Sequence, residues 1–282
     1  MSKNKRITIN KTTCTKCKKC ERDCPSLAIS IDTFTIDKNC IGCGHCVAIC
    51  DVQAITITNK TTTAIHPHSI SPEAFYNLST QTRTCRHYKP KPIEDEIISN
   101  LIDNIANYPS ASNGRQVQVT IITDPAKIKE LNDFTANKLN RLFTNYTKPV
   151  IKQMLQAFMG KKEIDKLENY KELFRLKMDK NPNLVTYNAP AIFIFHGKNH
   201  TSGMLQTDAD IWATYTSLYA STFGLGTCFN GFIVKALQKD NKAKQLLSIP
   251  KSHTVYITLL AGYPSISYSN ETSRDTPKFT IV

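Results

Sequence analysis

Two stretches near the start of the chain decide the fold of its first part. Residues 14–25 read CTKCKKCERDCP, and residues 40–51 read CIGCGHCVAICD. Both have the spacing C-x2-C-x2-C-x3-C, and the second follows the first at an offset of 26 residues. A short β-type segment comes after each, at 27–31 and at 53–57. Duplicated units of this size usually pack about a pseudo-two-fold axis, because neither half buries enough surface alone.

This spacing predicts two [4Fe–4S] clusters. A cubane cluster needs four thiolates, and in two-cluster ferredoxins the fourth Cys of each run binds the other cluster. Pro25 follows the first run as in the ferredoxin pattern, whereas Asp51 stands where the second run would have its proline. The expected ligand sets are Cys14, Cys17, Cys20 and Cys50 for one cluster, and Cys24, Cys40, Cys43 and Cys46 for the other. The alternatives are structural zinc, which usually shows two separated Cys pairs, and disulfides.

Composition favours a cytoplasmic protein. Among 282 residues, 40% are hydrophobic, and no run of about 18 apolar residues indicates a transmembrane helix. The basic residues 1–6 are not followed by an apolar stretch, which argues against a signal peptide. In this setting ten cysteines are typical of metal or redox sites rather than disulfides.

The formal charge of +13 overstates the basicity of the loaded protein. Two oxidised clusters with their thiolates would add about −4. Lys and Arg are spread along the chain without a nucleic-acid-binding motif, so an acidic electron carrier is the better electrostatic partner. Lys16, Lys18, Lys19 and Arg22 beside the first run are either a solvated face or a docking patch for such a carrier.

The rest of the chain predicts a second domain of mixed helices and strands. The expected organisation is an iron–sulfur domain at 1–60, a polar linker at 61–72 and a second domain at 73–282. Helical periodicity covers 93–105, with Pro92 suited to the first turn, and 204–223 reads as a long apolar helix. The Lys-rich stretch 125–180 is also helical. Buried strands are expected at 117–122, 191–195 and 254–260. The fold class is therefore α+β.

Three loops in this part carry weak ligand signals. Residues 82–88, TRTCRHY, place two guanidiniums and two hydroxyls close together, which suits a phosphate but also a solvated turn. Residues 109–115, PSASNGR, form a small-residue loop that lets backbone N–H groups approach a ligand, or a plain turn. Residues 224–232, GLGTCFNGF, could be only a helix C-cap and a turn.

Taken together, in this order, the three loops resemble the nitroreductase family of flavin enzymes. Residues 82–88 resemble its R-x-S-x-R-x-[FY] start. Residues 109–116 resemble its P-S-x-x-N-x-Q loop, with Arg115 where glutamine is usual, and 224–231 resemble its G-L-G-[ST]-C motif. The sequence NAP at 188–190 and GYP at 262–264 complete the order. The resemblance covers residues 73–282, and with the first domain the chain resembles the ferredoxin-fused nitroreductases of anaerobes.

The resemblance implies a homodimer with FMN at the subunit interface. Arg83, Thr84 and Arg86 would hold the phosphate and ribityl chain, and Arg274 is a further candidate phosphate contact. The partner chain would line the isoalloxazine with Ser110, Ala111, Ser112, Asn113 and Arg115. The backbone of Asn230 and Gly231 would hydrogen-bond flavin N5 and O4. A positive charge from Arg115 near the flavin pyrimidine would stabilise the anionic reduced form.

The resemblance also implies an FMN-dependent oxidoreductase without an assigned catalytic residue. Electrons from ferredoxin or NAD(P)H would pass through the clusters to FMN and then to a nitroaromatic, nitroimidazole, quinone or activated alkene. The rivals are another reductive reaction such as dehalogenation or flavin fragmentation, an electron carrier or redox sensor without a small substrate, and a structural iron–sulfur module. Cys85 and Cys228 are expected to be small buried hydrophobes, and Trp212 a core residue.

Overall fold

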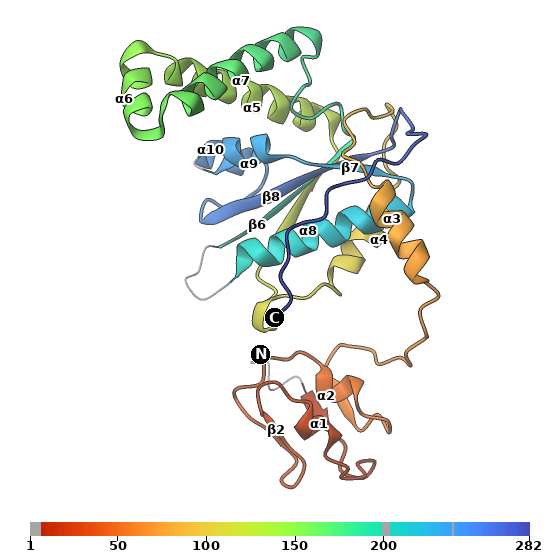
Figure 1. The fold of residues 1–282 in the computed structure, drawn as a ribbon. Coiled ribbons are helices and arrows are strands. Elements are labelled where there is room, and N and C mark those ends of the chain that lie inside the picture. Colours follow the sequence, from red (N-terminus) through yellow and green to blue (C-terminus); the bar gives the residue numbers. More distant parts are fainter. Residues whose placement is uncertain (1–6, 199–203, 239) are drawn as a thin grey trace. The chain divides into compact units, whose positions relative to one another are not determined.

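A computed structural model describes residues 7–198, 204–238 and 240–282, and it divides into two compact units. The first unit contains residues up to Ile70 together with Pro109–Arg115. The second contains Ser71–Tyr108 and Gln116–Val282. The basic residues 1–6, used in the prediction of location, lie outside the described part. Figure 1 follows the chain through both units.

The first unit consists of two short two-stranded sheets and two single-turn helices around a small core. Strands β1 (Ile7–Ile9) and β4 (Ile55–Ile57) pair antiparallel, as do β2 (Ile29–Ser30) and β3 (Thr35–Ile36). Helices α1 (Lys19–Arg22) and α2 (His45–Ala48) each contain the third Cys of their run. Isoleucines from the strands pack against the cysteines, so the core and the predicted cluster ligands share one small volume.

The backbone of the first unit repeats the duplication that the sequence predicts. The Cys24 thiol accepts from Ala28 N and the Cys50 thiol from Ala54 N, both at 3.2 Å. Lys18 and Gly44, 26 positions apart, occupy the residue before α1 and α2, both with left-handed backbone. Each half therefore places its fourth Cys and its helix in the same local geometry.

A four-stranded antiparallel sheet forms the centre of the second unit. Its strands are β5 (Gln118–Ile122), β6 (Ala191–Lys198), β7 (Gly226–Phe229) and β8 (His253–Gly262), in the order β5-β6-β8-β7. Strand β6 is buried on both faces because its side chains alternate between two cores. Ile192 and Ile194 belong to one core, and Phe193 and Phe195 to the other.

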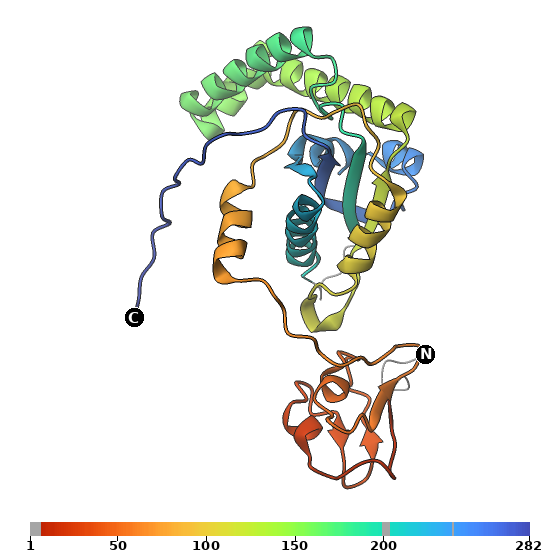
Figure 2. The ribbon, with the colours of Figure 1, turned by 90° about the vertical axis from the view of Figure 1, so that its right-hand side faces the viewer.

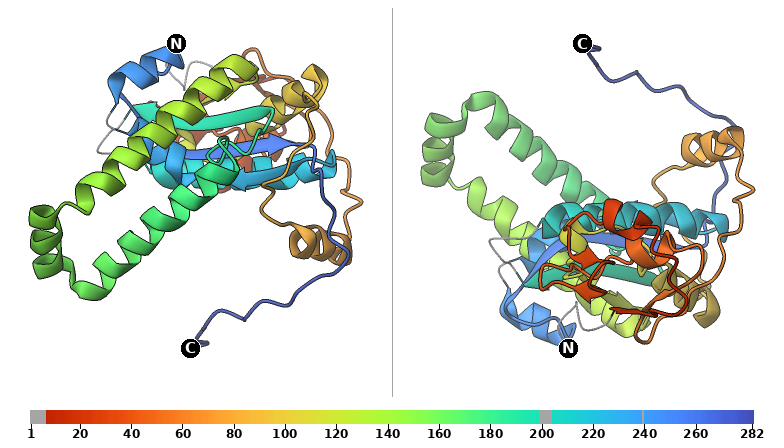
Figure 3. Two further views of the ribbon diagram at one scale, coloured as in Figure 1. Left: turned by 90° about the horizontal axis from the view of Figure 1, so that it is seen from above. Right: turned by 90° about the horizontal axis from the view of Figure 1, so that it is seen from below.

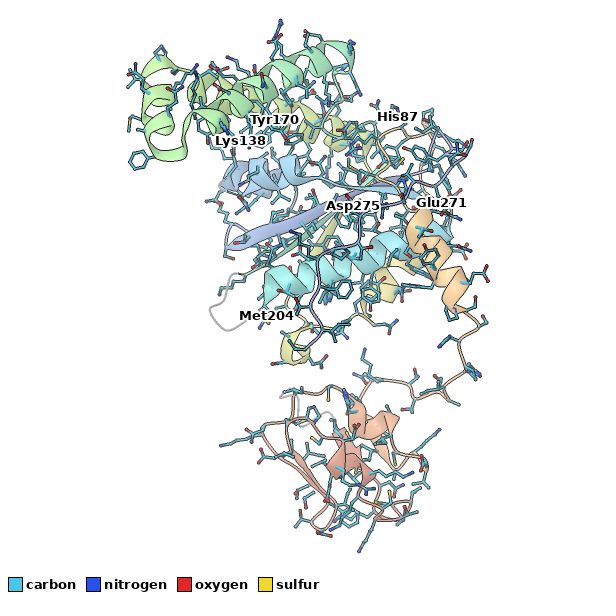
Figure 4. All side chains as sticks on the ribbon, in the orientation of Figure 1. His87, Lys138, Tyr170, Met204, Glu271 and Asp275 are labelled. Atoms are coloured by element: carbon cyan, nitrogen blue, oxygen red, sulfur yellow. The ribbon has the colours of Figure 1, made fainter. Side chains whose placement is uncertain are left out.

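Helices cover both faces of this sheet, as Figure 2 shows. One face carries α4 (Asp95–Ile105) and α8 (Leu205–Thr222), which bring Leu101, Ile105 and Trp212 into the core. The other carries α5 (Pro125–Tyr146), α7 (Lys161–Lys180), α9 (Gly231–Leu237) and α10 (Asn241–Leu246). Lys138 of α5 and Tyr170 of α7, labelled in Figure 4, mark this second layer. The short α6 (Pro149–Met159) joins α5 to α7 where they extend beyond the sheet (Figure 3).

The predicted α+β class is confirmed, and the strands and long helices lie close to their expected positions. The helix expected from about residue 92 begins at Asp95, because Glu94 has extended backbone and its carboxylate contacts Lys91 and the Tyr263 hydroxyl. The helical stretch 125–180 divides into α5, α6 and α7. The breaks come at Pro149 and at Gly160, whose φ is 83°.

Several elements were not predicted. Residues 224–231 contain the expected C-cap glycine, Gly224 with φ 72°, but strand β7 follows it instead of a turn. Helix α3 (Pro72–Gln81) begins at the end of the expected linker, where the Ser71 side chain accepts from Ala74 N. Strands β1 and β3 and helices α9 and α10 were also not predicted. Within the described residues, no helix has the length and apolarity needed to cross a membrane.

Candidate cofactor sites

The eight cysteines of the first unit line two separate cavities. A cavity of about 130 Å³ is lined by Cys14, Cys17, Cys20 and Cys50. A smaller cavity of about 20 Å³ is lined by Cys24, Cys40, Cys43 and Cys46. Each cavity thus gathers three cysteines of one run and the fourth of the other run, as the ferredoxin pattern requires. In the described part of the chain, no three His, Cys, Asp or Glu side chains converge on a point suited to one metal ion.

Burial opposes a free thiolate at Cys20 and Cys46, one cysteine in each cavity. Burial, and then the neighbouring Cys40 and Cys43, raise the pKa of Cys46 to about 12. Burial also raises the pKa of Cys20, whereas the exposed Cys17 has a lowered pKa because the Lys19 backbone N–H donates to it. Cationic iron would reverse this preference, because thiolates are held deprotonated by the metals that they bind. The donor set therefore fits an iron–sulfur cluster in each cavity.

The loop Pro109–Arg115 belongs to the first unit through the side chain of Asn113. Its Nδ2 donates to the carbonyl oxygens of Ile41 and Gly42, at 3.1 and 3.0 Å. These two residues lie between Cys40 and Cys43, two ligands of the second predicted cluster. Arg115 Nε in turn donates to Asn113 Oδ1 at 3.4 Å. The Asn113 amide therefore links this loop to the loop of the second thiol set.

Backbone geometry sets the shape of this loop. It contains a short 3-10 helix, η2 (Ala111–Asn113), in which Ser112 and Asn113 have positive φ. Arg115 also has positive φ, and its N–H donates to Ser110 Oγ at 3.1 Å. Consecutive left-handed residues are costly for side chains other than glycine and asparagine, and such backbone is concentrated at functional sites.

A second kind of cavity, of about 240 Å³, lies in the second unit beside the arginine-containing segment 82–86. Arg83 and Arg86 line it together with Thr82, Thr227 and Tyr268. Arg83 donates to Thr80 O and to Thr272 Oγ1, at 2.5 and 3.1 Å, while Arg274 donates to Thr82 O at 3.2 Å. Three guanidiniums therefore meet at this segment, and Thr84 is exposed between two of them. Cationic forks with nearby hydroxyls fit the phosphate end of a flavin mononucleotide.

Close backbone packing holds the arginine-containing segment against the sheet. Cys85 N donates to Thr227 O at 2.8 Å. A Cβ on Gly226 would lie 2.7 Å from the Cβ of Cys85, so only glycine permits this approach. Gly262 has the same role, because a Cβ there would lie 2.4 Å from Cδ of Pro190. Gly226 and Gly262 therefore allow the neighbouring segments to pack closely, and Gly226 itself lines the cavity.

In the turn from β7 into α9, two backbone groups were expected to face the flavin, those of Asn230 and Gly231. Only the N–H of Gly231 is available for a ligand. Asn230 N donates to Thr258 O at 2.9 Å, and its side chain caps α9 by accepting from Ile233 N. The Asn230 N–H is therefore already used inside the protein, which differs from the expectation that it would contact flavin. Gly231 is the first residue of α9, so its N–H has no acceptor within the helix. No atom lies within 4 Å of a Cβ placed on Gly231, so its surroundings are open.

Cys85 and Cys228 are buried, with 6% and 4% of their surfaces exposed. Burial raises the pKa of both thiols. They are therefore neutral core residues, as predicted. Trp212 also lies in the core, as predicted.

The comparison with family models decides the identity of the larger unit. The model of the nitroreductase family matches residues 80–263, which is more than half of the chain. The chain belongs to the nitroreductase family. A second model, described as a 4Fe-4S dicluster domain, matches residues 6–51. Together they confirm the predicted combination of a ferredoxin-type domain and a nitroreductase-type oxidoreductase.

Known proteins resemble the two units separately. Over 47 residues the chain is 45% identical to one component of the ion-translocating oxidoreductase complex of Methanosarcina acetivorans. This match covers 16% of the chain and only 18% of that protein. A nitroreductase with bound FMN from Bacteroides fragilis superimposes with a TM-score of 0.56 and 17% identity, over 75% of this chain and 100% of that one. One from Desulfitobacterium hafniense, also with bound FMN, gives 0.55 and 15%, over 73% and 97%. At such identities the likeness shows the nitroreductase fold.

The structure also shows site residues that the sequence did not indicate. Thr272 binds Arg83, and Tyr187 hydrogen-bonds Arg86. Burial raises the pKa of Tyr187, and the hydrogen bond with Arg86 opposes this rise. Tyr187 and Asn188 both have positive φ, immediately before the turn into Pro190. Asn188 is a residue type that tolerates left-handed backbone, but Tyr187 gives no sequence signal for it.

Proposed function

We propose that this nitroreductase-family chain reduces a small electron-poor acceptor with electrons delivered to its iron–sulfur unit by an acidic carrier or by NAD(P)H. When bound, two [4Fe–4S] clusters would relay single electrons, and FMN would pass an electron pair to the acceptor. The acceptor class is a nitroaromatic, nitroimidazole, quinone or activated alkene.

The observation that carries this proposal is the pair of hydrogen bonds from Asn113 to Ile41 and Gly42. The family resemblance assigns the loop of Asn113 to the flavin ring. The same loop packs against the ligand loop of the second thiol set. A loop shared in this way supports electron delivery from the iron–sulfur unit to the flavin, and it disfavours a purely structural iron–sulfur module.

The chain's own residues divide the binding of FMN among them. Arg83, Arg86 and Arg274 would neutralise its phosphate, with Thr84 as a hydroxyl donor. Gly231 N–H is the donor proposed for N5 or O4, where charge develops on reduction. Ser110, Ala111, Ser112, Asn113 and Arg115 would line the ring.

We propose a homodimer as the assembly that completes the site. Apolar side chains on α6 are exposed, among them Met154 at 60% and Phe158 at 87%. Tyr268 and Phe279 of the C-terminal segment are exposed at 61% and 74%. Exposed apolar side chains of this kind favour an interface, because their burial removes apolar surface from water. Light scattering should give twice the chain mass of 31.7 kDa, and a monomer would contradict this part of the proposal.

Anaerobic turnover on a panel of acceptors, with reduced ferredoxin and NAD(P)H compared as donors, tests the function. We expect reduction of at least one acceptor class with ferredoxin as donor. Transfer of electrons only to another protein, with no turnover on any small acceptor, would favour an electron carrier instead. Dehalogenated or fragmented products would favour another reductive reaction.

Asn113→Ala tests the carrying observation without removing a cluster ligand. We expect iron content to be retained while ferredoxin-driven reduction of the flavin slows. Asn107→Ala, which removes an exposed asparagine amide outside this loop, is the matched control and should behave as the wild type. Equal rates in both variants and the wild type would contradict the role given to Asn113.

A further inference from the structure

The two halves of the iron–sulfur unit differ at two backbone positions that favour glycine. In the second half, Gly42 and Gly44 have φ values of 65° and 85°. The equivalent positions in the first half are Lys16 and Lys18, with φ values of 55° and 58°. Left-handed backbone costs a residue with a Cβ more than it costs glycine. The first half therefore has lysines at two positions where the second half has glycine, the residue that adopts this backbone at lower cost.

Lys16 belongs to a small cationic and aromatic surface. Its Nζ lies 5.6 Å from the centre of the Phe34 ring, and Lys11 Nζ lies 5.5 Å from the same ring. Phe34 is half-buried in the turn between β2 and β3. Cys17, beside Lys16, is the exposed member of the first thiol set. Two ammonium groups thus flank an aromatic ring next to the exposed thiol of one predicted cluster.

Neighbouring carboxylates neutralise Lys18 and Lys19 but not Lys11 and Lys16. Lys18 pairs with Asp32, and Lys19 pairs with Asp51. The carboxylate of Glu21 accepts from Ile31 N, inside the unit. Among the described residues, no carboxylate forms an ion pair with Lys11 or Lys16. Of the docking patch considered from the sequence, only Lys16 is kept here. The structure adds Lys11, Phe34 and Cys17 to it.

We propose that this set, the Lys11–Lys16–Phe34 surface, is the docking site for an acidic one-electron carrier protein. The inference rests on the proposed function and names its electron donor. Positive charges steer an acidic partner and fix its orientation, while a small contact area allows rapid release. The carrier loses one electron in each encounter, so two encounters supply the pair that reduces one acceptor molecule. In the second half, Ile41 and Gly42 accept from Asn113, so the equivalent loop already has an internal partner.

Calorimetric binding of an oxidised acidic ferredoxin, used as the probe, tests this surface in the holoprotein. The wild-type Kd should rise steeply between low and high salt, because exposed charge pairs are screened. At low salt, Lys16→Gln should weaken binding roughly five- to tenfold, and a Lys11→Gln/Lys16→Gln double variant further. Lys38→Gln is the matched control: it removes one exposed charge from the second half of the same unit, and it should change the Kd less than about twofold.

A Lys16→Gly variant separates docking from folding. It should lose as much affinity as Lys16→Gln, while its resistance to denaturant should not fall, since glycine suits the backbone at this position. Equal weakening by Lys16→Gln and Lys38→Gln, or a Kd that does not depend on salt, would overturn the proposal. Reduction of the wild-type flavin by methyl viologen needs no docking protein. If the reduced dye failed to reduce the flavin, the proposed function would be contradicted. The binding of ferredoxin to the Lys11–Lys16–Phe34 surface is measured independently of that result.

Discussion

At the scale of single residues, Arg86 carries the most specific expectation for the cofactor. Arg86 lines the 240 Å³ cavity, and its side chain hydrogen-bonds Tyr187. A charge-assisted hydrogen bond to phosphate is worth about 1.5–3 kcal/mol. Arg86→Gln should therefore weaken FMN binding by about 10- to 100-fold in a flavin-fluorescence titration. Lys89→Gln, an exposed cation outside that cavity, is the control, and equal losses in the two variants would refute a phosphate contact by Arg86.

Gly226 makes a separate prediction about stability. Its added Cβ would overlap Cys85 Cβ and Sγ, at 2.7 and 2.8 Å. Overpacking of this kind typically costs about 1–3 kcal/mol. Gly226→Ala should lower the free energy of unfolding by that amount. Gly231→Ala, where nothing lies within 4 Å of the new Cβ, should change it by much less. A Gly226→Ala variant as stable as Gly231→Ala would contradict the close packing described between β7 and the arginine-containing segment.

At the scale of elements, a buried histidine pair connects three strands of the central sheet. His196 Nδ1 of β6 lies 2.9 Å from His253 Nδ1 of β8, and Thr120 Oγ1 of β5 lies 2.9 Å from His196 Nε2. Lys244 Nζ of α10 donates to His253 O. His196 is 2% exposed, and burial, followed by the proximity of His253, lowers its pKa from 6.5 to about 4.

This lowered pKa makes stability depend on pH in a defined direction. Between pH 6.5 and about 4, the unfolded chain binds a proton at His196 that the folded chain does not bind. Stability therefore falls as pH falls through this window, by roughly 3 kcal/mol in all. Trp212, the single tryptophan, lies in the adjoining core and reports the unfolding. Denaturant curves at pH 7 and 5 should differ more for the wild type than for His196→Gln, and equal differences would reject this assignment.

The elements that the sequence predicts well are those whose pattern comes from burial. Strand β6 is apolar over most of its length because both its faces are covered, and α8 and α4 are apolar where they meet it. The short β1 and β7 pair with strands far away in the sequence, and β3 has only two residues, so their own residues carry little signal. The same limit applies to α3, none of whose side chains is buried.

The interleaved thiol sets remain a prediction from the two-cluster ferredoxin pattern, and the same sets of cysteines line the two cavities of the first unit. The sequence could not show that Asn230 N–H is used by Thr258, that Thr272 binds Arg83, or that Asn113 reaches Ile41. Each of these contacts joins residues far apart in the chain, and no local pattern encodes such a pairing.

At the scale of the whole molecule, the chain joins a unit suited to one-electron chemistry to a nitroreductase-family unit suited to two-electron chemistry. The first gathers eight thiols around two cavities. The second places Arg83 and Arg86 around a third cavity, and Arg274 donates to Thr82, another residue of that lining. The loop Pro109–Arg115 is continuous in sequence with the second and packs in the first. Removal of the clusters by a chelator should therefore abolish ferredoxin-driven reduction and leave the arginine-lined FMN site able to bind.

The central claim is that electrons given to the iron–sulfur unit reach the flavin of the same protein. Anaerobic stopped-flow mixing with reduced methyl viologen, followed at cluster and flavin wavelengths, tests it most directly. The wild type should show cluster bleaching followed by flavin bleaching, and Cys43→Ala should lose the rapid flavin phase while binding FMN normally. A flavin that stays oxidised after the clusters of the wild type are reduced would contradict the account.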